Sequence, residues 1–260
     1  MDRGIADSVL GDDGLLYTFL WGHGHVAPVL VVDPADNSAE LRHLPTTEWV
    51  QVDAQLVVGP DGIIYMFGWG PDLSDVVTFD PSTEAFASKP NVPVTVWDAT
   101  RGTDGTIYLI GTSAGRLGAQ LTEVHVYDPR TGTASLIASS EDLGDGRALK
   151  TATDGRLIVF GSGGVASLDP QTLAWNQIAP APTADAYDRV VEIADGDRLI
   201  VSMGLDRNVR YFDGDRWHTV DAPAGVASIT RVGGRWIAIT LSPHLGHPSS
   251  AQYWEVTPVD

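Results

Sequence analysis

The amino-acid sequence predicts an all-β fold made of one repeated unit of short strands, and two markers that recur in phase support this prediction. The first marker is a glycine, in most copies after an aspartate, that comes just before an apolar run. The second is an Asp-Pro pair later in the unit. A period of about 43 residues with several short strands per unit is typical of β-propeller blades. Six glycines carry the first marker and predict six blades: Gly14, Gly62, Gly105, Gly155, Gly196 and Gly234.

The best-preserved unit runs from Asp154 to Pro182. It contains an apolar run from Leu157 to Phe160, a Gly-rich break, an Asp-Pro turn at Asp169, and a segment that begins near Trp175. Strands are expected on both sides of each break, because glycine and Asp-Pro are strong turn signals. With the strand before the Asp-Gly turn, a unit has four strands, named A to D in chain order. Such a sheet cannot bury its own faces, so neighbouring sheets must supply the core.

The repeat predicts one domain over residues 1–260. The expected blades cover approximately residues 5–43, 50–89, 96–138, 147–179, 187–220 and 226–257. No window combines helical periodicity with caps, so almost no helix is expected. The last blade has runs for three strands only, the third from Ala251 to Thr257. We therefore expect a three-stranded last blade whose outer edge is exposed or covered by a protein partner.

The order of these signals resembles a kelch repeat. A large apolar residue precedes Asp-Pro, an aromatic residue follows about seven positions later, and the unit ends in prolines, as in Leu168 through Trp175 to Pro182. Phe79 and Phe86 repeat this spacing, whereas the double glycine of kelch repeats is degraded in most units. The resemblance covers nearly the whole chain and implies a kelch-like propeller. That architecture hosts sugar oxidases, other carbohydrate-active enzymes and protein-binding modules.

The charge balance limits the partners of this acidic protein. The chain has 16 Lys and Arg residues against 34 Asp and Glu residues, which gives a formal net charge of −18. This charge repels phosphate backbones and anionic lipid headgroups, so neither nucleic acid nor a membrane is an expected partner. Many of the aspartates lie in the predicted turns. There a short carboxylate can accept a hydrogen bond from the backbone two residues on. Stabilisation of turns therefore explains most of the acidic residues.

The chain contains no cysteine, which excludes disulfides, thiolate nucleophiles and Cys-bound zinc. It also excludes a Cys-Tyr crosslinked copper site of the kind found in kelch-like galactose oxidases. Residues 1–15 lack the regions of a secretory signal, and no apolar run has the length of a membrane span. We expect a cytoplasmic protein if the native chain starts at Met1, and an extracellular one if the chain is an excised domain.

Two pairs of histidines lie in predicted B-to-C loops that are far apart in the sequence. His23 and His25 belong to the first blade, and His244 and His247 belong to the sixth. Closure of a ring would make these blades neighbours. Imidazole is a common ligand of transition metals, so the pairs could close on one divalent metal ion. Two alternatives are open. One neutral histidine could act as a general base, or the histidines lie in exposed loops without converging on one site.

A second set of candidates lies at the beginning of the A strands, which line the channel of a propeller. Asp7, Asp98 and Arg189 would place two carboxylates and one guanidinium at the channel mouth, and Gln55 takes the same position in the second blade. A guanidinium fork with carboxylates suits a sugar acid or a polyol. The alternative is a solvated channel whose charges offset one another.

Three tryptophans near the same loops, Trp21, Trp69 and Trp97, are candidates for stacking on a sugar or a hydrophobic ligand. Burial in the core is the alternative for these three. The other four tryptophans considered are expected to pack between blades: Trp175, Trp217, Trp236 and Trp254.

The function expected from these residues is binding of a small polar ligand, plausibly a carbohydrate, at the mouth of the channel. If the protein is an enzyme, lyase or hydrolase chemistry that uses the histidine cluster fits best, with a divalent metal ion as the one cofactor indicated. The competing class is a non-enzymatic protein-interaction module. An enzyme needs the His, Asp and Arg groups in one concave site, whereas an interaction module needs a broad apolar patch.

Overall fold

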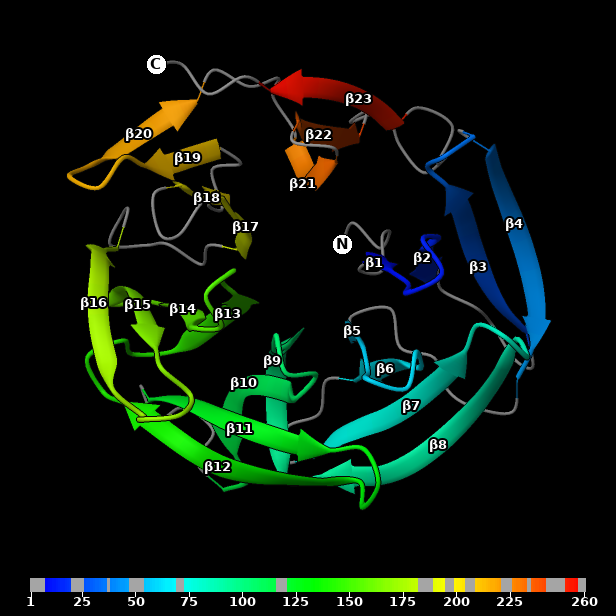
Figure 1. Cartoon of the computed structure of the whole chain (residues 1–260), viewed down its shortest axis with the longest axis horizontal. Helices are drawn as coiled ribbons and strands as arrows, with labels where there is room; N and C mark the ends of the chain where they lie inside the picture. Colours follow the sequence, from blue (N-terminus) through cyan, green and yellow to red (C-terminus); the bar gives the residue numbers. More distant parts are fainter. Residues whose placement is uncertain are drawn as a thin grey trace. The chain divides into compact units, whose positions relative to one another are not determined.

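The structure is a computed structural model in which every regular element of the described residues is a β-strand (Figure 1). It describes residues 8–19, 26–36, 38–46, 54–68, 73–115, 121–181, 189–194, 199–203, 209–220, 226–232, 235–241 and 251–256. The all-β prediction is confirmed for these ranges. None of them forms a helix with the length and apolar character that a membrane span requires.

The first compact unit, Met1–Glu141, holds three antiparallel sheets of four strands each. Within each sheet the strands pair in chain order through hairpins. The first sheet contains β1 (Ser8–Leu10), β2 (Leu16–Phe19), β3 (Val26–Asp33) and β4 (Ser38–Pro45). The second contains β5 (Gln55–Val58), β6 (Ile64–Phe67), β7 (Ser74–Asp80) and β8 (Ala85–Val92). The third contains β9 (Val94–Arg101), β10 (Ile107–Ser113), β11 (Thr122–Asp128) and β12 (Thr133–Ser140).

The second compact unit, Asp142–Asp260, holds two further four-stranded sheets and one of three strands. The fourth sheet contains β13 (Gly146–Thr151), β14 (Leu157–Gly161), β15 (Gly164–Leu168) and β16 (Trp175–Pro180). The fifth contains β17 (Arg189–Ala194), β18 (Leu199–Met203), β19 (Val209–Phe212) and β20 (Trp217–Val220). The last sheet contains β21 (Val226–Val232), β22 (Arg235–Leu241) and β23 (Ala251–Val256). Three strands are therefore described where the sequence predicts a three-stranded last blade.

Consecutive sheets within each unit meet through their first strands. In the first unit β1 lies beside β5 and β5 beside β9, and in the second unit β13 lies beside β17 and β17 beside β21. Core clusters lie between the first and second, the second and third, and the fourth and fifth sheets, so the middle strands of these sheets are deeply buried. In β6 and β14, for example, all residues are buried. This packing explains why the B strands read as continuous apolar runs.

Aromatic side chains fill the space between the first and second sheets. Phe19 from β2 meets Phe79 from β7 edge-on, with ring centroids 5.4 Å apart, and Phe86 packs against both rings. A second core between the second and third sheets brings Phe67 and Tyr127 to 5.1 Å. Each aromatic ring buries a large apolar area, and edge-to-face contact adds about 1 kcal/mol per pair. The cores thus lie between sheets, as the repeat predicts.

The Asp-Gly turns between A and B strands have one construction in four of the sheets. The aspartate Oδ1 accepts the backbone N–H two residues on, as Asp61 does from Ile63 at 3.2 Å. The glycine that follows has a φ of +77° at Gly62 and similar values at its equivalents. A residue with a side chain rarely adopts this conformation, so glycine is required here. The geometry of this turn explains why the glycine, usually preceded by aspartate, recurs as the first sequence marker.

The Asp-Pro turns between C and D strands confirm the prediction that turn aspartates bond the backbone two residues on. Asp128 accepts the N–H of Arg130 at 2.9 Å, and Asp169 accepts that of Gln171 at 2.8 Å. The backbone hydrogen bond from Arg130 is the main cause that lowers the pKa of Asp128. The degenerate Asp213 turn works in the same way, with the N–H of Asp215 at 2.8 Å.

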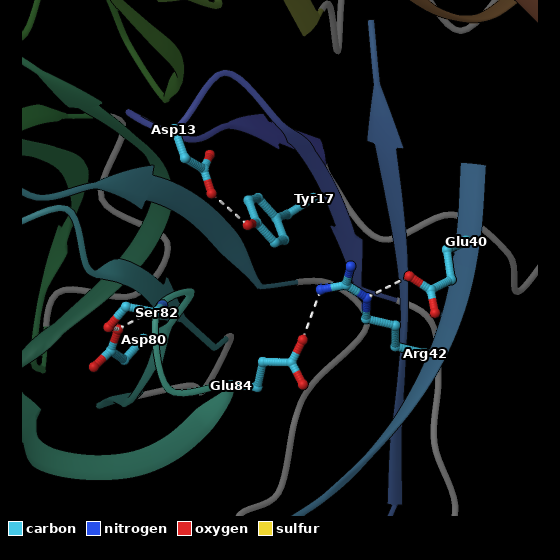
Figure 2. Close-up of polar contacts among 7 residues, drawn as sticks. All are labelled: Asp13, Tyr17, Glu40, Arg42, Asp80, Ser82 and Glu84. Atoms are coloured by element: carbon cyan, nitrogen blue, oxygen red, sulfur yellow. Dashed lines mark hydrogen bonds and ion pairs between the residues drawn. The ribbon is translucent and has the colours of Figure 1, made fainter. Parts of the chain in front are cut away.

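Specific polar bonds join neighbouring sheets at their outer strands. Arg42 from β4 donates to Glu40 at 2.9 Å and to Glu84 in the β7–β8 turn at 2.6 Å (Figure 2). In the second unit, the indole N–H of Trp217 on β20 donates to the carbonyl oxygen of Pro180 on β16 at 2.9 Å. Trp217 also packs against Phe160 and Phe212, which confirms its predicted role in packing between sheets.

Candidate functional site

The candidate site lies in the third sheet, where β10 ends and β11 begins. We call Trp97, Thr112, Ser113, Glu123 and His125 the Glu123 cluster. Residues 116–120 of the connecting loop lie outside the described residues, whereas both ends of the loop are described. In a propeller, loops of this kind gather on the face where ligands are commonly bound.

A glycine allows the strands to come together at this point. Gly111 pairs with Glu123 on one side and with Val96 on the other, and the β9–β10 register shifts between Ile110 and Gly111. A Cβ on Gly111 would lie 2.3 Å from the carbonyl oxygen of Thr95. No side chain fits there without moving the backbone, so the bulge in β9 depends on glycine. The bulge displaces Trp97 from the regular pairing of β9.

Glu123 is completely buried, and its carboxylate closes the loop. The Oε2 atom accepts the backbone N–H of Ser113 at 2.6 Å and the Oγ–H of the same residue at 2.6 Å. Hydrogen bonds to a charged acceptor are stronger than neutral ones, and they compensate part of the desolvation of the carboxylate. Glu123 therefore fastens the last residue of β10 to the beginning of β11.

His125 follows on the same face of β11 and is 2% exposed. Its Nε2 lies 3.6 Å from Glu123 Oε2, which is too long for a hydrogen bond, and no other described residue forms a hydrogen bond with it. Burial lowers the pKa of His125 from its ordinary value, and the charge of Glu123 opposes this effect without cancelling it. The imidazole is therefore neutral at pH 7.

The face continues with Tyr127, whose hydroxyl is also buried and has no hydrogen-bond partner in the part of the chain that the structure describes. Burial raises the pKa of Tyr127 to about 12, with smaller contributions from Asp128 and Asp61. Its ring packs against Phe67 and Tyr65 of the second sheet. Glu123, His125 and Tyr127 thus form a row of polar groups that faces a neighbouring sheet.

The exposure of each side chain determines which members of the Glu123 cluster can contact a ligand. Glu123 and His125 are too deeply buried to touch a ligand, and Glu123 acts by holding Ser113. Ser113 and Trp97 are partly exposed and can make contact. The indole Nε1 of Trp97 lies 3.5 Å from Thr112 Oγ1, at the limit of a hydrogen bond. Trp97 therefore presents an indole beside the Thr112 hydroxyl, whereas the Ser113 hydroxyl held by Glu123 belongs to the opposite face of β10, because side chains alternate along a strand.

Two residues of the predicted channel-mouth set are described with their side chains. Asp98 is 8% exposed, and its Oδ1 accepts the N–H of Ala99 at 2.8 Å. Gln55 is half-buried at the start of β5, the strand that lies beside β9. Arg189 begins β17, where the backbone alone is described. Asp7 lies outside the described residues. Convergence of these four residues at one mouth stays a prediction.

The predicted histidine cluster lies outside the described residues, because His23, His25, His244 and His247 all fall between the described ranges. The same is true of Trp21 and Trp69. Within the described ranges, no three His, Asp or Glu side chains are placed to hold a metal ion. The metal and general-base interpretations of these histidines stay predictions.

Sequence reasoning missed Glu123 and His125, although a signal for them exists. In the segment from Thr122 to Asp128, Glu, His and Tyr alternate with Thr and Val, which is also the pattern of a strand with one solvated face. A C strand is a middle strand with both faces covered in this fold. Polar residues at alternate positions of such a strand are therefore buried, and this could have identified them.

Comparison with known proteins supports the architecture. No family model matches the sequence, and no curated protein matches it. Among solved structures the chain is similar to virginiamycin B lyase from Staphylococcus aureus, with a TM-score of 0.61, 10% identity, and coverage of 100% of this chain and 86% of the lyase. It is also similar to the PQQ-bound aldose sugar dehydrogenase of Streptomyces coelicolor, with a TM-score of 0.62, 11% identity, and coverage of 98% and 94%.

A third similar structure is the β-propeller domain of the Trilobed protease from Pyrococcus furiosus, described as having an open velcro topology. The TM-score is 0.55 at 11% identity, with coverage of 98% of this chain and 82% of that domain. At such low identities these likenesses show the fold alone. The chain therefore has a β-propeller fold, which confirms the propeller predicted from the repeat, while the number of six blades and the kelch-like character stay predictions.

Proposed function

We propose that this protein is a six-bladed, kelch-like propeller that binds a small polar ligand of the carbohydrate class on the face formed by the B-to-C loops. The observation that carries the proposal is the partly exposed Trp97 at the bulge of β9, whose indole Nε1 lies 3.5 Å from Thr112 Oγ1 in the Glu123 cluster. An indole next to a hydroxyl is suited to a sugar, whose ring presents an apolar face and a polar rim.

The repeat and the sheets support the number of blades. Five four-stranded sheets and one three-stranded sheet follow one another in chain order, one for each glycine marker of the sequence. We propose that they form a single domain and that Gln55, Asp98 and Arg189 contribute to the same ligand site at the channel mouth. Asp98 would act mainly by ordering β9 directly after the bulge at Trp97, since its carboxylate is largely buried.

The enzymatic form of the proposal is lyase or hydrolase chemistry in which a histidine removes or donates a proton. Similar structures include a lyase and a sugar dehydrogenase, so the architecture is compatible with turnover. His23, His25, His244 and His247 are the proposed source of this histidine, or of the ligands to one divalent metal ion. The proposal for these four residues rests on the sequence alone.

The competing function, a protein-interaction module, receives less support from the described residues. Large exposed apolar side chains in these ranges are scattered over four sheets, whereas a broad interaction face needs a contiguous patch. They are Leu10, Val26, Leu41, Leu73, Leu136 and Leu173.

A ligand panel tests the proposed function. Neutral monosaccharides, amino sugars and sugar acids are screened by thermal shift, and hits are measured by calorimetry. Trp97→Ala should weaken binding of a hit about tenfold, which corresponds to the loss of about 1.4 kcal/mol of stacking. The matched control is Trp175→Ala, a partly exposed tryptophan that begins β16 just after the Asp169 turn. A panel without hits, or equal effects of both substitutions, would overturn the proposal.

A further inference from the structure

The A strands of the third to sixth sheets share a β-bulge at one place. In β9 the pairing with β10 shifts at Trp97, and in β13 the pairing with β14 shifts at Arg147, so each is the extra residue of its strand. In β17 and β21 the extra residues are Val191 and Ala227. Bulges re-aim a side chain and are common beside active sites. The extra residue is therefore a position from which a sheet can reach a ligand.

The bulges at Trp97 and Arg147 agree in detail. The residue before each of them pairs with a glycine, Gly111 in β10 and Gly161 in β14. A Cβ on Gly111 or Gly161 would lie 2.3 Å or 2.2 Å from a backbone carbonyl oxygen, so both places require glycine. Trp97 and Arg147 are partly exposed, whereas the residues on either side of them in the strand are buried. Arg147 therefore occupies in the fourth sheet the place that Trp97 occupies in the third.

The guanidinium of Arg147 is oriented by a carboxylate that is itself fixed. Its Nη2 donates to Asp145 Oδ2 at 3.1 Å. The N–H of Asp145 donates to Ser162 Oγ at 3.1 Å, and the carbonyl oxygen of Asp145 accepts the N–H of Ser162 at 3.0 Å. The bond to Asp145 uses one of the five N–H donors of the guanidinium. Since the side chain is 23% exposed, a ligand can reach Arg147 while Asp145 holds it.

We propose that Arg147 is a specificity-determining residue that binds the carboxylate of a sugar acid. A guanidinium matches a carboxylate through two parallel hydrogen bonds, a geometry that a single sugar hydroxyl does not offer. The chain has a net charge of −18, which repels an anion, so an acidic ligand needs a cationic group at its site. The inference rests on the proposed function, because it names the class of sugar bound at the same channel mouth.

The alternative is that Arg147 and Asp145 form an ion pair with a structural role alone, and Arg156 provides the matched control for it. Arg156 lies in the A–B turn of the same sheet, outside the bulge, and donates to Asp154 at 2.7 Å. Each arginine is bound to the aspartate two positions before it, and the Arg156 side chain is 31% exposed. Exposed ion pairs contribute at most about 1 kcal/mol, so Arg147→Gln and Arg156→Gln should both fold.

Calorimetry with the full chain tests the assignment, using galacturonate against galactose and glucuronate against glucose. The wild type should bind the acid of one pair about tenfold more tightly than its neutral counterpart. Arg147→Gln should remove this preference by weakening the acid and leaving the neutral sugar unchanged. Arg147→Lys keeps the charge without the planar fork and should retain part of the preference. Arg156→Gln should bind both sugars as the wild type does. Added salt should weaken binding of the acid alone.

The possible results separate this inference from the proposed function. A neutral sugar that binds as tightly as its acid would overturn the role of Arg147 and leave the proposed function in place. Equal losses of acid binding in Arg147→Gln and Arg156→Gln, or lower thermal stability of Arg147→Gln with an unchanged preference, would also overturn this role alone. If none of the four sugars and no other member of the ligand panel binds, the proposed function fails and the inference fails with it.

Discussion

The ring of Tyr65 occupies the space in which Gly59 would otherwise carry a side chain. A Cβ on Gly59 would lie 2.6 Å from Tyr65 Cε2 and 2.6 Å from Asp61 Oδ1. The Tyr65 hydroxyl donates to Asp61 Oδ2 at 2.9 Å, so the ring cannot swing away without losing this bond. The equivalent pairs are Gly11 with Tyr17 and Gly102 with Tyr108. In the fourth sheet Ile158 replaces the tyrosine, and Ala152 replaces the glycine.

We expect Gly59→Ala to destabilise the protein by about 2 kcal/mol, because the added methyl group overpacks the site. The same substitution combined with Tyr65→Ile should cost less than the sum of the single changes, since this pair copies Ala152 and Ile158. Urea unfolding of the four proteins in a double-mutant cycle measures the coupling. Additive effects would show that the ring does not require the glycine.

The Glu123 carboxylate should contribute more to stability than its partner hydroxyl. Ser113→Ala removes one hydrogen bond to a charged group and should cost about 1.5 kcal/mol. Glu123→Ala leaves a cavity and two donors without an acceptor, for about 3 to 4 kcal/mol. Hydrogen exchange at the Ser113 amide should accelerate in Glu123→Ala and change little in Ser113→Ala. Equal stability of both variants would contradict the role of Glu123 as the fastener of the loop.

The buried His125 makes stability depend on pH in a defined direction. Its pKa is lowered in the folded protein, so between that value and the unfolded value of about 6.5 the unfolded chain binds more protons. Stability should therefore decrease as pH falls below about 6.5, by at most about 1.4 kcal/mol per pH unit from this group. His125→Gln should lose this contribution. Chemical unfolding of both proteins from pH 8 to 5 gives the difference, and parallel curves would falsify the prediction.

The loop histidines give a prediction that depends on the sequence alone. If His23, His25, His244 and His247 share a metal ion, untagged protein should contain about one equivalent by elemental analysis. His25→Ala with His244→Ala should abolish metal content, and affinity should fall below about pH 6 as protons compete for the imidazoles. The Trp175→Ala variant serves as the control. If the wild-type protein contains no metal, and the double variant binds ligand as the wild type does, these histidines have no functional role.

Much of the fold could be predicted because its signals are local. A positive φ at Gly62 and the turn bond of Asp61 require residue types that are visible in the sequence, and their recurrence determines the strand plan. The Glu123 cluster could not be predicted in this way. Its members become neighbours through strand register and through the burial of both faces of β11, and neither is visible in a single segment. The close approach at Gly111 likewise depends on the bulge in β9.

The bonds between neighbouring sheets have a consequence for how the repeats are ordered during folding. Arg42 joins a fourth strand to the turn of the following sheet, whereas Trp217 joins a fourth strand to the carbonyl of the preceding one. These contacts use different chemistry at different positions, although the backbones of the units are alike. A unit placed beside the wrong neighbour would leave a charge or an indole unmatched. Divergence between repeats thus opposes misassembly, which is a characteristic hazard of chains built from similar modules.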